Sequence, residues 1–328
     1  MAPPDLIVFG LNASHEFATQ VSNFMGLSLA PHEEREFEDG EHKARPLVSV
    51  RGKDVFVLHA LYGEPALSAN DKLMRLLLFI GALKDAAAAR VTAVVPYLAY
   101  ARKDRKTKVR DPVSTRYIAT LFEAVGTDAI MTLDVHNLAA FQNAFRCRTE
   151  HLLAAPLLIE KLLPELGQRE IVVVSPDAGG IKRAEDFRQR LSAKINQPVG
   201  AAFIEKYRSG GIVSGSLLAG SVNDRDVIIV DDLISSGTTV MRALHACRDR
   251  QAAKIFVVAS HGLFSKDAAT VLNDPALQRI IISDSVSPYR IEKTSIVEKI
   301  VFSSCAPLFA QAILRLHGNE SLSELAEA

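Results

Sequence analysis

Short apolar runs alternate along this chain with longer segments in which apolar residues recur every three or four positions. The short runs are typical of buried strands and the longer spacing of helices, so the alternation predicts parallel sheets flanked by helices. The predicted strands include Leu6–Phe9, Val55–His59, Val91–Pro96, Ile130–Leu133, Ile171–Ser175, Val199–Ile204, Val227–Val230, Ile255–Ser260 and Ile280–Ser283. The predicted helices include Asp71–Lys84, Ser114–Val125, Ala155–Leu163 and Thr239–Asp249.

The two halves of the chain share a strand–loop–helix–strand pattern. The strand after Asp54 leads to a helix containing Met74-Arg75, and the strand after Asp226 leads to a helix containing Met241-Arg242. Such an internal repeat indicates two similar domains. We place them at residues 1–152 and 153–304, and we expect a C-terminal helix at 305–318 to pack back on the first domain.

Composition narrows the class of protein. The chain has 38 basic and 38 acidic residues, so no overall field attracts a polyanion or a membrane surface. Its three cysteines are far apart, which is typical of free thiols in a reducing compartment. No apolar stretch approaches the length of a membrane-spanning helix. We therefore expect a cytoplasmic protein that binds neither nucleic acid nor a membrane.

One motif of the second half carries clear chemistry. A buried strand ends in Asp231-Asp232, and the five residues from Ser235 to Thr239 that follow are small or hydroxylated and begin a helix. Ligands bind at the carboxyl ends of parallel strands, and a helix N-terminus with nearby hydroxyls can hold a phosphate. The two carboxylates can accept hydrogen bonds from vicinal hydroxyls. The motif therefore predicts a sugar-phosphate site formed by Asp231, Asp232, Ser235, Ser236, Gly237, Thr238 and Thr239.

This stretch resembles the ribose-phosphate loop of type I phosphoribosyltransferases and of ribose-phosphate pyrophosphokinases. The first half separates these families, because simple transferases have no counterpart to it. The segments that resemble the pyrophosphokinases are Phe37-Glu38-Asp39-Gly40-Glu41, residues 96–106, Leu133–His136, Ser175–Gly180 and Ala259–Ser265. They occur in the family's order from about residue 5 to about residue 318, and so cover nearly the whole chain.

The resemblance implies two similar type I phosphoribosyltransferase-like domains, each a mainly parallel sheet flanked by helices. It also implies transfer of a diphosphate from ATP to ribose 5-phosphate, with ATP bound by the first domain and ribose 5-phosphate by the second. The matching ATP-binding positions are Phe37, Asp39, Gly40, Glu41, Arg102, Lys103 and Asp104. Arginine and lysine in the basic segment 102–110 suit the phosphates of ATP.

The same resemblance implies further roles and an assembly. His136 and Asp177 fall on positions associated with Mg²⁺, and Asp134 is a possible additional ligand. Lys206 and Arg208 fall on the catalytic lysine and arginine that begin a flexible loop. Members of the family form homo-oligomers built from dimers, often hexamers, and we expect a homo-oligomer here as well.

The chain departs from the family pattern at several positions. Lys103 stands where glutamine is usual, Thr238 replaces a common glycine, and residues 208–215 are about one residue short. Ser49 and Arg51 match a family pattern linked to control by phosphate or ADP. However, Asp85 and Ala87 replace the basic residue and the serine that are usual on the next helix, so we expect weak or altered phosphate activation. Two other functions stay open: a transferase that consumes the phosphoribosyl diphosphate, and a non-catalytic subunit that regulates true synthetases.

Overall fold

The computed structural model describes residues 5–209, 212–265 and 267–327, and of residues 206–209, 212–216 and 326–327 it describes the backbone alone. The chain divides into two compact units. Residues 1–153 and 305–328 form the first, and residues 154–304 form the second. Within the described ranges, no helix combines the length and the apolar character needed to cross a membrane.

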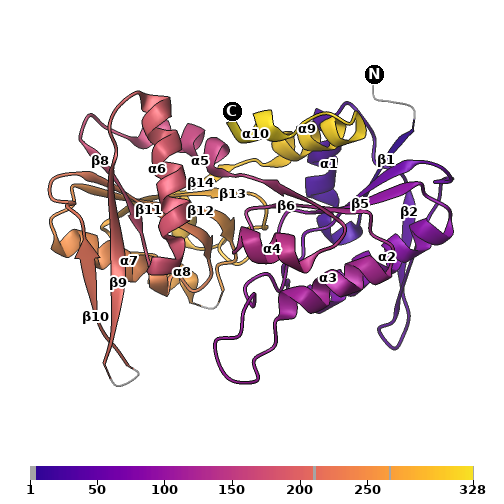
Figure 1. Ribbon diagram of the computed structural model, residues 1–328, viewed down its shortest axis with the longest axis horizontal. Coiled ribbons are helices and arrows are strands. Elements are labelled where there is room, and N and C mark those ends of the chain that lie inside the picture. The colour runs from indigo at the N-terminus through magenta and orange to yellow at the C-terminus, as the bar shows by residue number, and fades with distance from the viewer. Residues whose placement is uncertain (1–4, 210–211, 266, 328) are drawn as a thin grey trace. The chain divides into compact units, whose positions relative to one another are not determined.

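The first unit is built on a five-stranded parallel sheet with the order β1-β4-β5-β6-β7 (Figure 1). A separate antiparallel hairpin consists of β2 and β3. The strands are β1 (Leu6–Gly10), β2 (His32–Glu36), β3 (His42–Pro46), β4 (Asp54–Leu58), β5 (Arg90–Val95), β6 (Ala129–Leu133) and β7 (Arg148–Leu152). The helices are α1 (His15–Phe24), α2 (Ala69–Asp85), α3 (Ser114–Ala124), α4 (Leu138–Ala144), α9 (Ala306–His317) and α10 (Ser323–Glu327).

Local sequence explains where these elements begin and what they bury. Ser68 caps α2 by accepting a hydrogen bond from the backbone N–H of Asp71, whose side chain accepts one from the N–H of Ser68 in return. The apolar residues of β4, β5 and β6 are buried because helices or loops cover both faces of the sheet. The resulting core includes Phe9, Phe79 and Phe122.

The last long helix returns to the first unit. The rings of Phe17 on α1 and Phe309 on α9 meet edge to face, with their centroids 5.7 Å apart. Beyond this apolar contact, His317 lies 2.7 Å from Asp54, and Arg90 donates a hydrogen bond to the carbonyl of Leu316. These contacts join the end of the chain to the sheet of the first unit.

The second unit has a seven-stranded sheet with the order β10-β9-β8-β11-β12-β13-β14, parallel except for the pairing of β9 with β10. Figure 1 shows β9 and β10 extending from it as a long hairpin. The strands are β8 (Ile171–Ser175), β9 (Gly200–Ser209), β10 (Ile212–Ala219), β11 (Asp226–Ile234), β12 (Lys254–Gly262), β13 (Leu277–Ser283) and β14 (Ile300–Ser303). The helices are α5 (Ala155–Leu162), α6 (Ile181–Ile195), α7 (Thr238–Asp249) and α8 (Ala268–Val271).

The strand order of the second unit reverses between β8 and β11. From β8 the chain passes through α6 to β9 on one side, and it later returns to β11 on the other side. In open α/β sheets, such a reversal leaves a crevice at the carboxyl ends of the two strands, and ligands bind there. Asp177 follows β8, and Asp231 and Asp232 lie near the end of β11.

The predicted strands and helices are all present, and both copies of the repeat fold as a strand, a helix and a parallel strand. The predicted α/β class with parallel sheets is confirmed. Sequence analysis missed the β2–β3 hairpin, β7, β10 and β14. The structure also differs at Lys206 and Arg208, which lie within β9 rather than in a loop after it.

Candidate active site

The acid pair of the second unit is held by a buried strand. Asp232 is almost fully buried, and its backbone N–H donates a 2.9 Å hydrogen bond to Oδ1 of Asp231. Burial and the adjacent charge of Asp232 raise the pKa of Asp231 to about 7. A carboxyl group that has a raised pKa and lies near the end of a strand is typical of a ligand-binding site.

The turn after the acid pair forms the N-terminus of α7. Gly237 caps this helix with a φ of 80°, a conformation that glycine adopts without strain, and a Cβ there would lie 2.9 Å from the Leu272 side chain. The hydroxyls of Ser236 and Thr238 lie 2.6 Å apart at the start of the helix. Thr238 has a helical backbone, so a residue larger than glycine fits at this position.

The segment 263–265 holds the turn in place through hydrogen bonds. Ser265 donates a backbone hydrogen bond to the carbonyl of Ser235, and the two side-chain oxygens lie 2.8 Å apart. The N–H of Leu263 donates to the carbonyl of Ile234. These bonds fix the backbone of the turn, so that its N–H groups and hydroxyls can face an anion without rearrangement.

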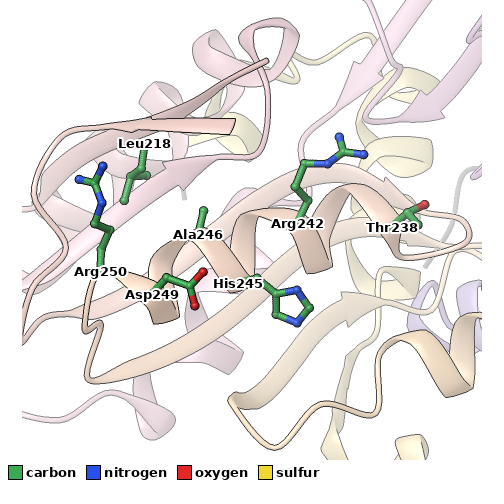
Figure 2. A pocket seen from close by; sticks show the side chains of 7 residues that line it. All are labelled: Leu218, Thr238, Arg242, His245, Ala246, Asp249 and Arg250. Atoms are coloured by element: carbon green, nitrogen blue, oxygen red, sulfur yellow. The ribbon is translucent and has the colours of Figure 1, made fainter. Parts of the chain in front are cut away.

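A pocket of about 520 Å³ lies beside this turn, between α7 and β10. Figure 2 shows Arg242 extending from the same side of α7 as Ala246, while Arg250 follows the end of the helix. The pocket shares Thr238 with the turn but is lined by neither acid. Its full lining is Leu218, Thr238, Arg242, His245, Ala246, Asp249 and Arg250. We therefore place the candidate site at the acid pair and the turn rather than in this pocket.

In the first unit, Phe37 to Glu41 form the tip of the β2–β3 hairpin. The N–H of Phe37 donates to the carbonyl of Glu41, the N–H of Glu41 donates to the carboxylate of Asp39, and Gly40 has a φ of 89°. The Phe37 ring is 42% exposed, with the guanidinium of Arg35 5.3 Å from its centroid. An exposed aromatic ring on a rigid turn can stack on a nucleotide base.

The basic segment follows β5 and is held by hydrogen bonds within its own loop. The ammonium of Lys103 donates hydrogen bonds to Thr107 and to the carboxylate of Asp111. The hydrogen bond from Lys103, followed by one from the hydroxyl of Thr107, holds the pKa of Asp111 well below its usual range. Arg102 is exposed. The sequence predicted Lys103 as a phosphate-binding cation. It gave no sign that the carboxylate of Asp111 already neutralises the charge of Lys103.

The segments around Asp104 and His136 meet in the first unit. The side-chain amide of Asn137 donates a 2.6 Å hydrogen bond to the carboxylate of Asp104. His136 is exposed next to it, and Asp134 has a φ of 33° and lies 3.8 Å from His151. Asn137 was missed in the sequence, although it directly follows a predicted metal position.

Asp177 belongs to the second unit, and its backbone precedes the short 3-10 helix Ala178–Gly180. Its carboxylate accepts hydrogen bonds from the N–H groups of Gly179 and Gly180. Over the described part of the chain, no three His, Cys, Asp or Glu side chains converge so that they could hold a metal ion. A carboxylate such as that of Asp177 suits Mg²⁺, which keeps several waters and binds through one or two carboxylates and substrate phosphates.

The loop 47–53 and the end of α2 also meet in the first unit. The N–H of Gly52 donates to the carbonyl of Ala87, and Ala87 has a φ of 64°. The predicted regulatory positions Ser49 and Arg51 are exposed on this loop. Asp85 is the last residue of α2, so a negative charge stands near the segment where a regulatory anion was expected.

Arg183 on α6 is a charged neighbour of the acid pair that sequence analysis missed. Its guanidinium lies 3.8 Å from Asp231 and 3.7 Å from Asp232. Lys206 and Arg208 lie on β9, but their side chains fall outside the described residues.

Similarity to known proteins shows which family this chain belongs to. Residues 6–126 match the N-terminal domain of ribose phosphate pyrophosphokinase, and residues 215–327 match the phosphoribosyl synthetase-associated domain. The ribose-phosphate pyrophosphokinase of Caldanaerobacter subterraneus subsp. tengcongensis is 38% identical over 322 residues, which cover 98% of this chain and 97% of that protein. This chain belongs to the ribose-phosphate pyrophosphokinase family.

Other members agree with this assignment. The ribose-phosphate pyrophosphokinase of Haemophilus ducreyi is 34% identical over 328 residues, which cover 99% of this chain and all of that protein. The crystal structure of phosphoribosylpyrophosphate synthetase from Mycobacterium smegmatis superposes with a TM-score of 0.86 at 31% identity, covering 96% of this chain and 99% of that one. The ribose-phosphate pyrophosphokinase fold therefore extends over both units.

Proposed function

We propose that this chain transfers the β,γ-diphosphate of ATP to the C1 hydroxyl of ribose 5-phosphate, giving 5-phospho-α-D-ribose 1-diphosphate and AMP for nucleotide biosynthesis. The observation that carries this proposal is the pair of carboxylates beside a hydroxyl-rich helix N-terminus, at the point where the sheet of the second unit reverses. The full-length similarity to ribose-phosphate pyrophosphokinases supports the same reaction.

We place ribose 5-phosphate in the second unit. Asp231 and Asp232 accept hydrogen bonds from the vicinal ring hydroxyls, and the turn from Ser235 to Thr239 binds the 5-phosphate. The positive end of α7 and the N–H groups of its first turn favour a dianion there. The support is the geometry of the turn, whose backbone is already fixed by Ser265.

We place ATP on the first unit. The exposed ring of Phe37 stacks on adenine, while Asp39, Gly40 and Glu41 at the same hairpin tip supply polar contacts. The phosphates are met by the basic segment that includes Arg102, Lys103 and Asp104. Lys103 is paired with Asp111 before ATP binds. Breaking that pair offsets part of the attraction between Lys103 and the phosphates.

Mg²⁺ is the metal that we assign to the reaction. The resemblance implies that His136 of the first unit and Asp177 of the second would each be a partner of the ion, directly or through water, with Asp134 as an additional candidate. Water and phosphate oxygens are the other ligands that Mg²⁺ prefers. When bound, the ion neutralises charge on the triphosphate.

The residues of the chain mainly position the two substrates and stabilise charge. The C1 oxygen bonds to the β-phosphorus, the bond from that phosphorus to the oxygen bridging to the α-phosphate breaks, and the hydroxyl proton is released. AMP leaves with the bridging oxygen. Lys206 and Arg208 on the β9–β10 hairpin stabilise the charge of the transferred group, because phosphoryl transfer depends on positioning and charge neutralisation.

We further propose that the protein is a cytoplasmic homo-oligomer built from dimers, such as a hexamer. Two pairs of large apolar side chains are exposed on helices of the first unit, each pair four residues apart: Met74 and Leu78 on α2, and Tyr117 and Leu121 on α3. Such exposed apolar groups are typical of subunit contacts. All three cysteines are free thiols, which suits a reducing compartment.

A single assay tests the reaction. The protein is incubated with Mg²⁺, ATP and ribose 5-phosphate, and the products are followed by phosphorus NMR. We expect AMP and 5-phospho-α-D-ribose 1-diphosphate in equal amounts, and no reaction when unphosphorylated ribose replaces the sugar phosphate. Asp232→Asn should abolish the reaction, while the matched exposed variant Asp249→Asn should not.

The same assay separates the alternatives. A protein that forms nucleotide from the sugar diphosphate and a free base is a phosphoribosyltransferase, and the proposed reaction is then wrong. A protein that forms no product alone, but changes the rate of an added active synthetase, is a regulatory subunit.

A further inference from the structure

Arg183 forms an ion pair with each member of the acid pair, Asp231 and Asp232. It stands in the first turn of α6, and this helix packs against β8 and β11. Its Nη1 atom is 3.8 Å from Oδ1 of Asp231 and 3.7 Å from Oδ1 of Asp232. One guanidinium therefore lies close to both carboxylates.

The three side chains form a group that is largely shielded from water. The exposed fraction is 26% for Arg183, 17% for Asp231 and 6% for Asp232. Two adjacent carboxylates in such surroundings repel each other and resist ionisation. The nearby charge of Arg183 acts in the opposite direction and favours the ionised form.

The charged groups around Asp231 come from several elements. Asp232 lies on the same strand, Arg183 on α6, His261 on the adjoining strand β12, and Asp177 before the short 3-10 helix that contacts β11. Of these, Asp232 and Arg183 dominate the electrostatics of Asp231. The balance between them decides whether the pair can accept two hydrogen bonds at neutral pH.

We infer that Arg183 is a positioning residue that keeps Asp231 and Asp232 ionised and aligned to accept hydrogen bonds from the vicinal hydroxyls of ribose 5-phosphate. The inference rests on the proposed function, because it assigns the pair to the sugar. A protonated carboxyl presents one donor and fewer acceptor sites. Losing Arg183 therefore weakens binding of the sugar most strongly where the pair is already close to protonation.

The test compares Arg183→Met, Arg183→Lys and the control Arg190→Met. Arg190 lies on the same helix with a similar exposed fraction of 27%, but it pairs with Asp186 instead. The KM for ribose 5-phosphate, the KM for ATP and kcat are measured from pH 6 to pH 9. Comparing variants at each pH cancels the titration of the substrates themselves.

For Arg183→Met, we expect the KM for ribose 5-phosphate to rise about tenfold below pH 7 and to approach the wild-type value at pH 9, because removing a cation beside a carboxylate moves its titration by about one pH unit or more. The KM for ATP should not change. Arg183→Lys should recover most of the loss, and Arg190→Met should match wild type. A loss that is equal at every pH, or that lysine does not reduce, would show a purely structural role and overturn the inference.

A second measurement separates this inference from the proposed function. The carboxylates of wild type and Arg183→Met are titrated by carbon NMR of labelled aspartate, without substrate. If the titration of Asp231 does not move upward in the variant, the inference is wrong even in an active enzyme. If wild type makes no product but the titration moves, the electrostatic role of Arg183 holds and the proposed reaction is what fails.

Discussion

Replacing Asp231 with asparagine should make the folded protein more stable at alkaline pH. Burial and the charge of Asp232 raise the pKa of Asp231 to about 7, from an ordinary value of 3.8. The unfolded chain releases this proton near pH 4, whereas the folded chain holds it until about pH 7. The stability that the protonated side chain contributes is therefore lost as the pH rises through this window.

The size of the stability change follows from the difference between the pKa of Asp231 in the folded chain and that in the unfolded chain. They differ by about 3 units, and each unit corresponds to about 1.36 kcal/mol, so ionised Asp231 lowers the free energy of unfolding by at most about 4 kcal/mol. Asparagine is neutral at every pH and can still accept the hydrogen bond from the N–H of Asp232. Asp231→Asn should therefore gain up to about 4 kcal/mol at pH 8, about 2 kcal/mol at pH 5 and nothing below pH 4.

The assay is guanidinium unfolding followed by far-ultraviolet circular dichroism from pH 4 to pH 8, without Mg²⁺ or substrate. Asp274→Asn serves as a control of opposite sign, because hydrogen bonds from His245 and from a backbone N–H lower the pKa of Asp274 and stabilise its ionised form. That variant should lose stability above pH 4. A gain for Asp231→Asn that does not vary with pH, or a loss at pH 8, would refute the reasoning.

Four further results are expected. Lys206→Ala should lower the rate of AMP release by on the order of 10³, and near-normal release would exclude its catalytic role. Gly237→Ala should lower the free energy of unfolding by about 1–3 kcal/mol and raise the KM for ribose 5-phosphate, because φ is 80° and a leucine side chain fills the space. Asp111→Asn should lower the KM for ATP by about two- to fivefold by releasing Lys103, since a partly exposed ion pair contributes only modestly. Phosphate should activate weakly in rate assays, because Asp85 repels it; full activation at millimolar phosphate would contradict this.

The parallel sheets could be predicted because their strands are buried on both faces. Strands such as Ile171–Ser175 and Ala129–Leu133 are buried along their whole length, so an unbroken apolar run marks them in the sequence. The β2–β3 hairpin could not be found this way. Its strands read HEERE and HKARP, and they are joined partly by ion pairs such as Arg45 with Glu33 at 2.7 Å.

The candidate site was predictable only where its residues lie together in sequence. The acid pair and its turn are one continuous motif and could be found from residue types and spacing. Arg183 reaches that pair from a helix that begins about fifty residues earlier, and Ser265 supports the turn from about thirty residues later. Contacts of this kind depend on how helices and strands pack, and no local pattern reports them.

The return of α9 to the first unit has a consequence for how the protein is made. Phe309 is fully buried there and pairs with Phe17, yet the 151 residues from 154 to 304 are synthesised between α1's unit and this helix. At about 5–20 residues per second, a ribosome needs roughly 8–30 s for that stretch. The side of α1 that packs against α9 therefore stays uncovered until α9 has been synthesised, and a chain terminated before α9 leaves this apolar contact unmade and prone to aggregation.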